Sequence, residues 1–224
     1  MEQIAQQENL HLSVFSCDIL EESDRKALGE LDIDVYIGNA AIGNSGSVCE
    51  IPITYVREVF ETNIFANFAT LQIIFQKMMQ RGKNGRIILL SSMAGRIPMP
   101  FLSPYCASKA AIETFMTCLR TELIFLKGCS IQVAIIEPGA YATGFNKENN
   151  EKKYSWMRKH SYFLPILSKL QKIEKKVWNF LEQKPYTSII QKYVTVVECK
   201  HLKYRYVAPW WQALFIQLGR TLGL

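Results

Sequence analysis

Residues 86–109 read RIILLSSMAGRIPMPFLSPYCASK, and this stretch decides the fold. After Arg86 it begins with four consecutive branched apolar residues, a pattern that predicts a short strand buried on both faces. Two serines end the strand, and Ser103 and Pro104 then begin a helix that we expect to reach about residue 127, with Ser103 as its N-cap. A buried strand that leads into a long helix is the repeating unit of a parallel α/β sheet. The stretch therefore predicts an α/β fold built on a parallel sheet.

Other segments repeat this alternation before and after the opening stretch. Short apolar runs predict strands, and longer runs with apolar residues about 3.6 positions apart predict helices. The predicted strands are residues 10–17, 34–37, 131–136 and 204–207, and the predicted helices are residues 55–80, 163–180 and 210–224. Residues 146–153 are polar and predict a mobile connection. The order of these segments indicates a sheet with helices on both faces.

The length and composition suit one domain. Of the 224 residues, 49% are hydrophobic, which is enough to fill the core of one large α/β domain. We therefore expect a single domain over residues 1–224. Residues 1–145 supply its sheet core and catalytic segment, and residues 146–224 supply the substrate-side helices, the last strand and the C-terminal helix.

The cysteines and the first residues indicate a compartment. Six cysteines stand far apart and form no C-x-x-C pair, so neither a zinc site nor a disulfide framework is predicted. The three histidines share no metal-ligand spacing. Residues 1–20 lack a basic segment followed by an apolar one, and no uncharged apolar run approaches the ~18 residues of a membrane span. These features favour the reducing cytoplasm.

Charge is divided unevenly along the chain. Residues 1–150 hold 12 Lys or Arg against 16 Asp or Glu, whereas residues 151–224 hold 14 against 4. Two interpretations stay open for the basic part. One is a solvated helical face rich in lysine, and the other is peripheral contact with an anionic membrane, for which Trp210 and Trp211 supply apolar anchors. Nucleic acid is not expected as a partner, because no nucleic-acid-binding motif accompanies the charge.

Three side chains of the opening stretch suit proton transfer to an oxygen. Tyr105 and Lys109 are four residues apart, which places both on one face of the predicted helix. An ammonium beside a phenol stabilises the phenolate and lowers the phenol pKa toward the range of a working acid–base catalyst. Ser92 follows a strand at its carboxyl end, where open α/β sheets bind ligands, and its hydroxyl suits a substrate oxygen that gains charge. Tyr105 and Lys109 alone are also compatible with an ordinary surface pair.

The spacing of Ser92, Tyr105 and Lys109 resembles the Ser…Tyr-x-x-x-Lys signature of the short-chain dehydrogenases/reductases. The resemblance implies a Rossmann-like, doubly wound parallel sheet and an NAD(P)-dependent oxidoreductase that interconverts an alcohol and a carbonyl. It implies Tyr105 as the general acid/base, Ser92 as the residue that positions the carbonyl, and Lys109 as the partner of Tyr105 and of the nicotinamide ribose. Asn63, within the sequence TNIFA, resembles the fourth catalytic residue, which holds a proton-relay water; a structural hydrogen bond is the alternative.

Further matches imply contacts with a nicotinamide nucleotide, either NAD or NADP. Asp18 and Ile19 resemble the pair that meets the adenine, although Asp18 equally suits an N-cap for the acidic stretch after it. Residues 38–41 read GNAA and resemble an Asn-Asn-Ala-Gly element beside the cofactor, whereas residues 138–143 read PGAYAT and resemble Pro-Gly-x-x-x-Thr beside the nicotinamide carboxamide. The implied cofactor-binding residues are Asp18, Ile19, Asn39, Ala40, Tyr105, Lys109, Pro138, Gly139 and Thr143.

The resemblance also implies a sheet that is N-terminally incomplete, with its first two strands missing. Members of the family open with a strand, a glycine-rich turn that approaches the pyrophosphate, a helix and a second strand. In this chain Gly29 is the only glycine before Gly38, and residues 1–8 resemble the tail of a later helix. Residues 10–17 must then pair with residues 34–37 or leave an apolar edge exposed. The alternative function is therefore a non-catalytic truncated remnant or an interaction module.

The residues expected around the substrate are mostly apolar. They are Ile97, Met99, Phe101, Tyr141, Phe145 and Trp156. This bias favours a small lipophilic alcohol or carbonyl, such as a steroid, a retinoid or a fatty carbonyl. The resemblance also implies a homodimer face on the long helices around Asn63 and Tyr105.

Overall fold

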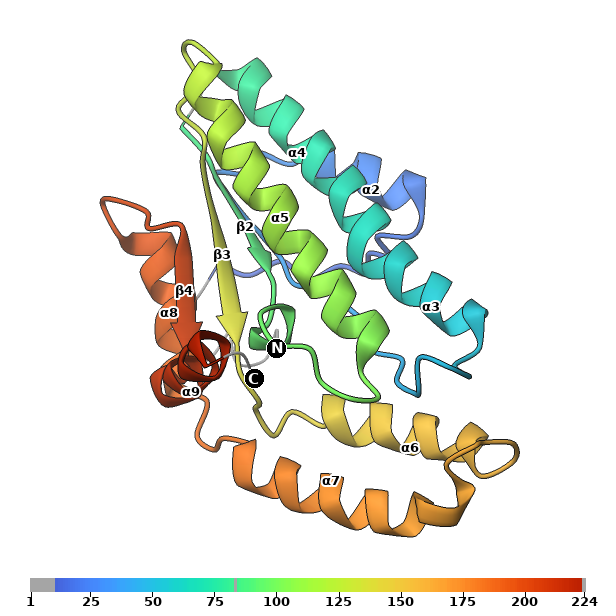
Figure 1. The fold of residues 1–224 in the computed structure, drawn as a ribbon. Coiled ribbons are helices and arrows are strands. Elements are labelled where there is room, and N and C mark those ends of the chain that lie inside the picture. The colour runs from blue at the N-terminus through green and yellow to red at the C-terminus, as the bar shows by residue number, and fades with distance from the viewer. Residues whose placement is uncertain (1–10, 83, 223–224) are drawn as a thin grey trace.

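The computed structural model describes residues 11–82 and 84–222. Within them, four strands form one parallel sheet in the order β1-β2-β3-β4 (Figure 1). The strands are β1 (Val35–Gly38), β2 (Arg86–Leu90), β3 (Gln132–Pro138) and β4 (Arg205–Ala208). The register pairs Ile37 with Ile88 and Ile88 with Ala134, so the carboxyl ends of the strands meet at one edge. Open parallel sheets bind their ligands at that edge.

Helices connect and flank the strands. The α-helices of the described residues are α2 (Glu22–Gly29), α3 (Ile53–Phe60), α4 (Asn67–Arg81), α5 (Ser103–Phe125), α6 (Phe145–Met157), α7 (Leu167–Leu181), α8 (Thr187–Glu198) and α9 (Trp210–Thr221). Shorter helical turns are the π-helix η1 (Glu61–Ala66) and the 3-10 helices η2 (Met93–Gly95) and η3 (Leu164–Ile166). α3, η1 and α4 follow one another without a break. A π segment inside a long helix frequently marks a functional position.

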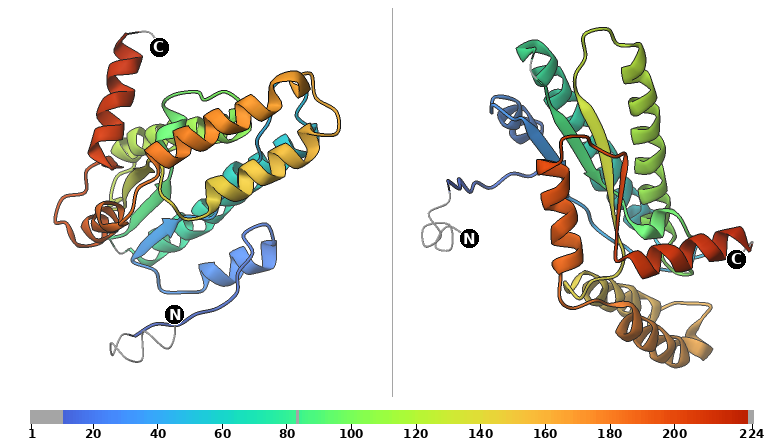
Figure 2. Two further views of the ribbon diagram at one scale, coloured as in Figure 1. Left: turned by 90° about the horizontal axis from the view of Figure 1, so that it is seen from below. Right: turned by 90° about the vertical axis from the view of Figure 1, so that its left-hand side faces the viewer.

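The sheet is buried between helices on both faces, with α5 and α8 on opposite sides of the strands (Figure 2). On one face, Ile87, Leu89, Val133 and Ile135 pack against Ile74, Met78, Ile112 and Met116 of α4 and α5. On the other face, Ile88, Leu90, Ala134 and Ile136 pack against Ile189 and Val196 of α8. Because both faces are covered, β2 and β3 appear in the sequence as unbroken apolar runs.

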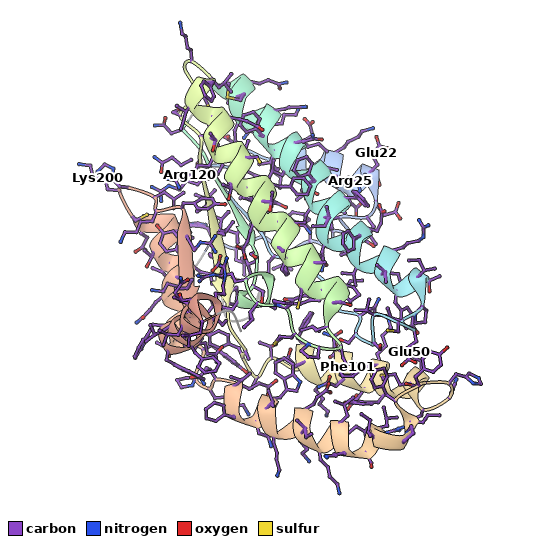
Figure 3. All side chains as sticks on the ribbon, viewed as in Figure 1. Glu22, Arg25, Glu50, Phe101, Arg120 and Lys200 are labelled. Atoms are coloured by element: carbon purple, nitrogen blue, oxygen red, sulfur yellow. The ribbon has the colours of Figure 1, made fainter. Side chains whose placement is uncertain are left out.

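α6 and α7 lie side by side beyond the carboxyl ends of the strands (Figures 1 and 2). A buried ion pair joins them, because the Lys153 ammonium lies 2.7 Å from each carboxylate oxygen of Glu174. The Tyr154 hydroxyl donates a 2.5 Å hydrogen bond to the same carboxylate. Phe101, labelled in Figure 3, packs edge-on against Phe163 with the ring centroids 5.1 Å apart. The contact between Phe101 and Phe163 attaches the helix pair to the loop that precedes α5.

Most of the predicted elements are confirmed. The strands predicted over residues 34–37, 86–90, 131–136 and 204–207 correspond to β1 to β4. The helix predicted over residues 55–80 corresponds to α3, η1 and α4, and that over residues 163–180 corresponds to η3 and α7. The C-terminal helix is confirmed over Trp210–Thr221. The predicted helix tail at residues 1–8 lies outside the described residues.

The strand predicted for residues 10–17 is wrong for the part that the structure describes. Leu10 lies outside that part, and residues 11–17 have no regular structure. Among the described strands, β1 pairs only with β2, and the apolar side chains of Leu12, Val14 and Phe15 are exposed. An apolar run becomes a strand only where a neighbouring strand completes its hydrogen bonds. Of the two arrangements predicted for this region, the exposed edge is the one observed.

Three further differences concern helices. Ser103 is the first residue of α5 rather than its N-cap, which is Leu102. Residues 146–153, predicted to be a mobile connection, belong to α6, because Lys153, Tyr154 and Met157 are buried beneath α7 and the loop around it. No element was predicted for residues 187–198, which form α8. Its buried residues face the sheet at helical spacing, but the flanking polar residues obscure that pattern in the sequence.

Candidate active site

A pocket of about 630 Å³ opens at the carboxyl edge of the sheet. Its polar lining includes Asn39, Ser92, Tyr105, Lys109 and Thr143. Its apolar lining includes Met93, Ile97, Trp178, Leu181, Trp211 and Phe215. A largely apolar cavity with a few convergent polar groups is typical of a site for a small lipophilic ligand.

Ser92 stands between the end of β2 and the short helix η2. Its hydroxyl accepts a hydrogen bond of 3.1 Å from the Ala94 amide and donates one of 3.4 Å to the Pro138 carbonyl. These two contacts hold the hydroxyl between the ends of β2 and β3. Ser92 and Tyr105 both line the pocket.

Tyr105 lies in the first turn of α5, and its ring packs 5.5 Å from the ring of Phe145, centroid to centroid. Burial raises the pKa of Tyr105 to about 12, although the nearby Ser92 hydroxyl acts in the opposite direction. This shift is opposite to the one predicted from the Tyr105–Lys109 spacing. Burial disfavours the charged phenolate more than the surrounding groups stabilise it.

Lys109 is buried one helical turn after Tyr105. Its ammonium donates a 2.8 Å hydrogen bond to the Leu90 carbonyl and lies 5.6 Å from the centroid of the Tyr105 ring. Burial lowers the pKa of Lys109 to about 8, because desolvation disfavours the ammonium. The ammonium is therefore charged at neutral pH and close to the phenol, which is the arrangement that the four-residue spacing predicted.

Asn63 lies in the π-helix η1 and is fully buried. Its side chain bonds both backbone groups of Ile42, accepting from the amide at 2.8 Å and donating to the carbonyl at 2.9 Å. It also donates to the Ser108 hydroxyl at 3.0 Å, and Ser108 in turn donates to the Tyr105 carbonyl at 2.8 Å. Asn63 thus connects the loop after β1 with the helix that carries Tyr105. Both the structural and the water-holding role remain compatible with this position.

The residues after β1 reach the same pocket only in part. Asn39 lines the pocket, and its side-chain oxygen accepts a 3.4 Å hydrogen bond from the Tyr193 hydroxyl. The Ala40 carbonyl accepts a 2.9 Å hydrogen bond from the Asn67 side chain. Asp18 and Ile19 do not line the pocket. The Asp18 carboxylate accepts a 2.9 Å hydrogen bond from the Leu20 amide, and α2 begins only at Glu22, with Glu21 as its N-cap. Asp18 is therefore not the N-cap of α2.

The loop after β3 is brought to the pocket as predicted. Pro138, Gly139 and Thr143 all line it. The Gly139 amide donates a 2.8 Å hydrogen bond to the Ala208 carbonyl, which ties this loop to the end of β4. A side chain at position 139 has no room, since its Cβ would lie 2.0 Å from the side-chain oxygen of Gln212.

Several pocket residues were missed in the sequence because they come from the C-terminal helices. Trp178 and Leu181 belong to α7, Tyr186 and Ile189 lie before and on α8, and Gln212 belongs to α9. The apolar face of α7 is visible in its sequence, but helical periodicity shows only that a face is buried. It does not show which part of the molecule covers that face.

The described residues fit one end of a dinucleotide better than its centre. Asn39, Lys109 and Thr143 offer polar groups beside Tyr105, where a nicotinamide ribose and carboxamide would bind. The first described helix, α2, carries Glu22 and Asp24 in its first turn. Carboxylates at a helix N-terminus repel phosphate instead of binding it. The pocket therefore suits the nicotinamide end, and α2 offers no site for the pyrophosphate.

Residues 11–82 and 84–222 contain neither a cluster of metal ligands nor a membrane-spanning helix. Nowhere in these residues do three or more His, Cys, Asp or Glu side chains gather as metal ligands. None of the helices formed there combines the length and the apolar character that crossing a membrane requires.

A known family and a relative match the chain. Residues 1–154 match the family described as short chain dehydrogenase. VdlC, a probable short-chain type dehydrogenase/reductase of Helicobacter pylori, is 35% identical over 158 residues, in a match that covers 65% of this chain and 57% of that protein. The chain thus spans little more than half the length of this relative.

Two solved structures share the fold. A short chain dehydrogenase/reductase from Burkholderia phymatum, in complex with NAD, has a TM-score of 0.78 at 15% identity, covering 98% of this chain and 78% of that chain. A 7α-hydroxysteroid dehydrogenase, complexed with NADH and 7-oxo glycochenodeoxycholic acid, has a TM-score of 0.59 at 26% identity, covering 65% of this chain and 58% of that chain. The parallel sheet and the match over residues 1–154 lead to one conclusion: this chain belongs to the short-chain dehydrogenase family.

Proposed function

We propose that the chain carries the catalytic part of an NAD(P)-dependent oxidoreductase that interconverts a lipophilic alcohol and its carbonyl. One observation carries the proposal: the side chains of Ser92 and Tyr105 line the same mainly apolar pocket, with the buried Lys109 ammonium 5.6 Å from the centroid of the Tyr105 ring. Because one fold serves many reactions, this argument depends on the site and not on the sheet.

The three side chains divide the work of carbonyl reduction. A bound nicotinamide supplies or accepts the hydride. As the carbonyl oxygen gains negative charge, the hydroxyls of Ser92 and Tyr105 stabilise it by hydrogen bonding, and Tyr105 transfers its proton to it. The Lys109 ammonium, 5.6 Å from the ring centroid, stabilises the resulting phenolate. Because burial raises the pKa of Tyr105 to about 12, the phenol holds its proton at neutral pH and has it available for the substrate oxygen.

The pocket lining supports a lipophilic substrate. Ile97, Met99 and Phe145 line the pocket together with Trp178 of α7 and Trp211 of α9. The 7α-hydroxysteroid dehydrogenase that shares the fold holds 7-oxo glycochenodeoxycholic acid, which is a steroid. We therefore propose a steroid, a retinoid or a fatty carbonyl as the substrate class.

The first prediction is that residues 1–224 alone bind NADH and NADPH no more tightly than millimolar. The pyrophosphate needs backbone amides at a helix N-terminus, and neither a glycine-rich turn in the sequence nor the acidic first turn of α2 provides them. Fluorescence titration measures the affinity. The control is a chimera in which a relative supplies the strand, glycine-rich turn, helix and strand ahead of residue 10. Micromolar binding by residues 1–224 themselves, about −8 kcal/mol, would contradict the prediction.

The second prediction concerns the acid/base role of Tyr105. In the chimera, Tyr105→Phe should lower turnover of a lipophilic ketone by ~10²–10⁴-fold, the usual contribution of general acid–base catalysis. The affinity for NADPH should stay within about twofold, since the aromatic ring remains. Tyr162→Phe is the matched control, because Tyr162 is an exposed tyrosine outside the pocket. A Tyr105→Phe variant that retained more than about a tenth of the rate would contradict the acid/base role of Tyr105.

The third prediction concerns pH. The pKa of Lys109 is lowered to about 8, so its ammonium is present below that pH and lost above it. Tyr105 stays protonated over the same range. The reduction rate should be constant from about pH 6 to 7.5 and fall above pH 8, as the phenolate loses its cationic neighbour. In Lys109→Met the rate should be low and lack this step. A wild-type profile that remained flat to pH 9.5 would exclude the role of Lys109.

We also propose peripheral contact with an anionic membrane through α9. Its exposed side chains include Trp210, Phe215 and Leu218, with 73%, 70% and 54% of their surface accessible. Helix α7, which contacts α9 through the rings of Phe180 and Trp211, carries exposed lysines that include Lys172 and Lys176. Apolar insertion combined with attraction to anionic lipid is the usual basis of such contacts.

The fourth prediction tests this contact by co-sedimentation with vesicles at low salt. Vesicles of phosphatidylcholine with phosphatidylglycerol should recover more protein than vesicles of phosphatidylcholine alone. The double variant Trp210→Ser/Phe215→Ser should lose the difference. Phe125→Ser on α5, equally exposed, should keep it. Equal recovery with both vesicles would leave only the solvated, lysine-rich face.

We further propose a homodimer and a reducing compartment. The dimer is supported by exposed aromatic side chains on η1, α4 and α5, namely Phe65, Phe68 and Phe115. The rings of Phe68 and Phe115 pack 4.9 Å apart, centroid to centroid, and so form one apolar patch. The compartment is supported by the six cysteines, which are all free thiols.

A further inference from the structure

Gln212 is a buried amide in the first turn of α9. Only 6% of its surface is accessible, whereas the neighbouring residues Trp210 and Leu214 are exposed. Its position beside Trp211 on the pocket wall would suit an apolar side chain. A buried amide persists in such surroundings only where its polar atoms find partners.

Both polar atoms of Gln212 are bonded to backbone groups of other segments. The side-chain oxygen accepts a 2.9 Å hydrogen bond from the Ala140 amide, in the loop after β3. The side-chain nitrogen donates a 2.7 Å hydrogen bond to the carbonyl of Leu181, the last residue of α7. One side chain therefore connects α9, the end of α7 and the loop after β3, three segments that all line the pocket.

The contact between Gln212 and the loop after β3 also explains why residue 139 is a glycine. A Cβ there would lie 2.0 Å from the Gln212 oxygen and 3.0 Å from Cδ of Pro209. The Gly139 φ lies outside the left-handed region, so space and not backbone conformation requires the glycine. On its other side, the Gly139 amide donates to the Ala208 carbonyl at 2.8 Å. The loop is thereby held between β4 and α9.

We propose that Gln212 is a positioning residue of the active site. It sets the loop of residues 138–140 and, through the Pro138 carbonyl that accepts from the Ser92 hydroxyl, the position of Ser92. It also holds α9 in place, so that Trp211, Phe215 and Ile216 form a wall of the substrate pocket. The catalytic consequence of this positioning rests on the proposed reductase function. The structural role of Gln212 in holding the loop does not rest on it.

The test of the positioning is amide hydrogen exchange of the whole chain. Gln212→Met keeps the side-chain volume but removes both hydrogen bonds, so protection of the Ala140 amide should fall at least tenfold. Protection of the Ile135 amide, which donates to the Tyr204 carbonyl within the sheet, should stay within about twofold. Gln217→Met is the matched control, because Gln217 lies on the same helix but is exposed, and its side-chain oxygen accepts from Arg96 and not from the loop after β3. Unchanged protection of Ala140, or an equal loss at Ile135, would overturn the proposal.

Turnover gives a second, independent test in the chimera defined above. Gly139→Ala should lower kcat, because its Cβ displaces the Gln212 amide. In Gly139→Ala/Gln212→Ala that amide is absent, so the combined loss of kcat should be at least threefold smaller than the product of the two single losses. Strictly multiplicative losses would count against the coupling of positions 139 and 212. Absence of turnover in every protein, the parent included, would refute the proposed function and leave hydrogen exchange to decide the role of Gln212.

Discussion

The packing of the first turns of α5 against the end of β2 is the contact on which the site depends. The Lys109 ammonium bonds the Leu90 carbonyl at 2.8 Å, and the Ser91 hydroxyl donates to the Lys109 carbonyl at 3.1 Å. The connection passes so close to α5 that a Cβ at Gly95 would lie 2.8 Å from the Lys109 carbonyl carbon. Strand and helix are thereby held together at the carboxyl edge of the sheet. This junction between β2 and α5 brings Ser92 and Tyr105 to the same pocket.

A buried charge cluster holds the neighbouring strand ends at the same edge. Glu137, the residue before Pro138, has no accessible surface and forms ion pairs with Arg96 and Arg205. Arg205 also pairs with Glu113 of α5 at 3.2 Å. A buried carboxylate without partners is strongly destabilising, so removing either arginine should destabilise the chain at the carboxyl end of β3. The same backbone presents the Pro138 carbonyl to Ser92.

The two halves of the pocket have different physical characters. The half from β2, β3 and α5 is held by short polar contacts and contains the groups suited to proton transfer. The half from α7, α8 and α9 is mainly apolar, and within it Gln212 provides directed hydrogen bonds to the loop after β3 and to the end of α7. In the proposed function, proton transfer and substrate binding would depend on different elements, which meet at residues 138–140.

The sequence by itself determined the parallel α/β class, the strands of the sheet and the grouping of Ser92, Tyr105 and Lys109. These follow from local patterns: unbroken apolar runs mark strands buried on both faces, and a spacing of four places two side chains on one helical face. Only the tertiary structure decided that residues 11–17 lack a strand, that burial raises the Tyr105 pKa, and that α7 and α9 close the pocket. The hydrogen-bonding partner that a strand needs, the burial that raises the Tyr105 pKa and the hydrogen bonds of Gln212 all involve residues far apart in the sequence. No local sequence pattern specifies such contacts.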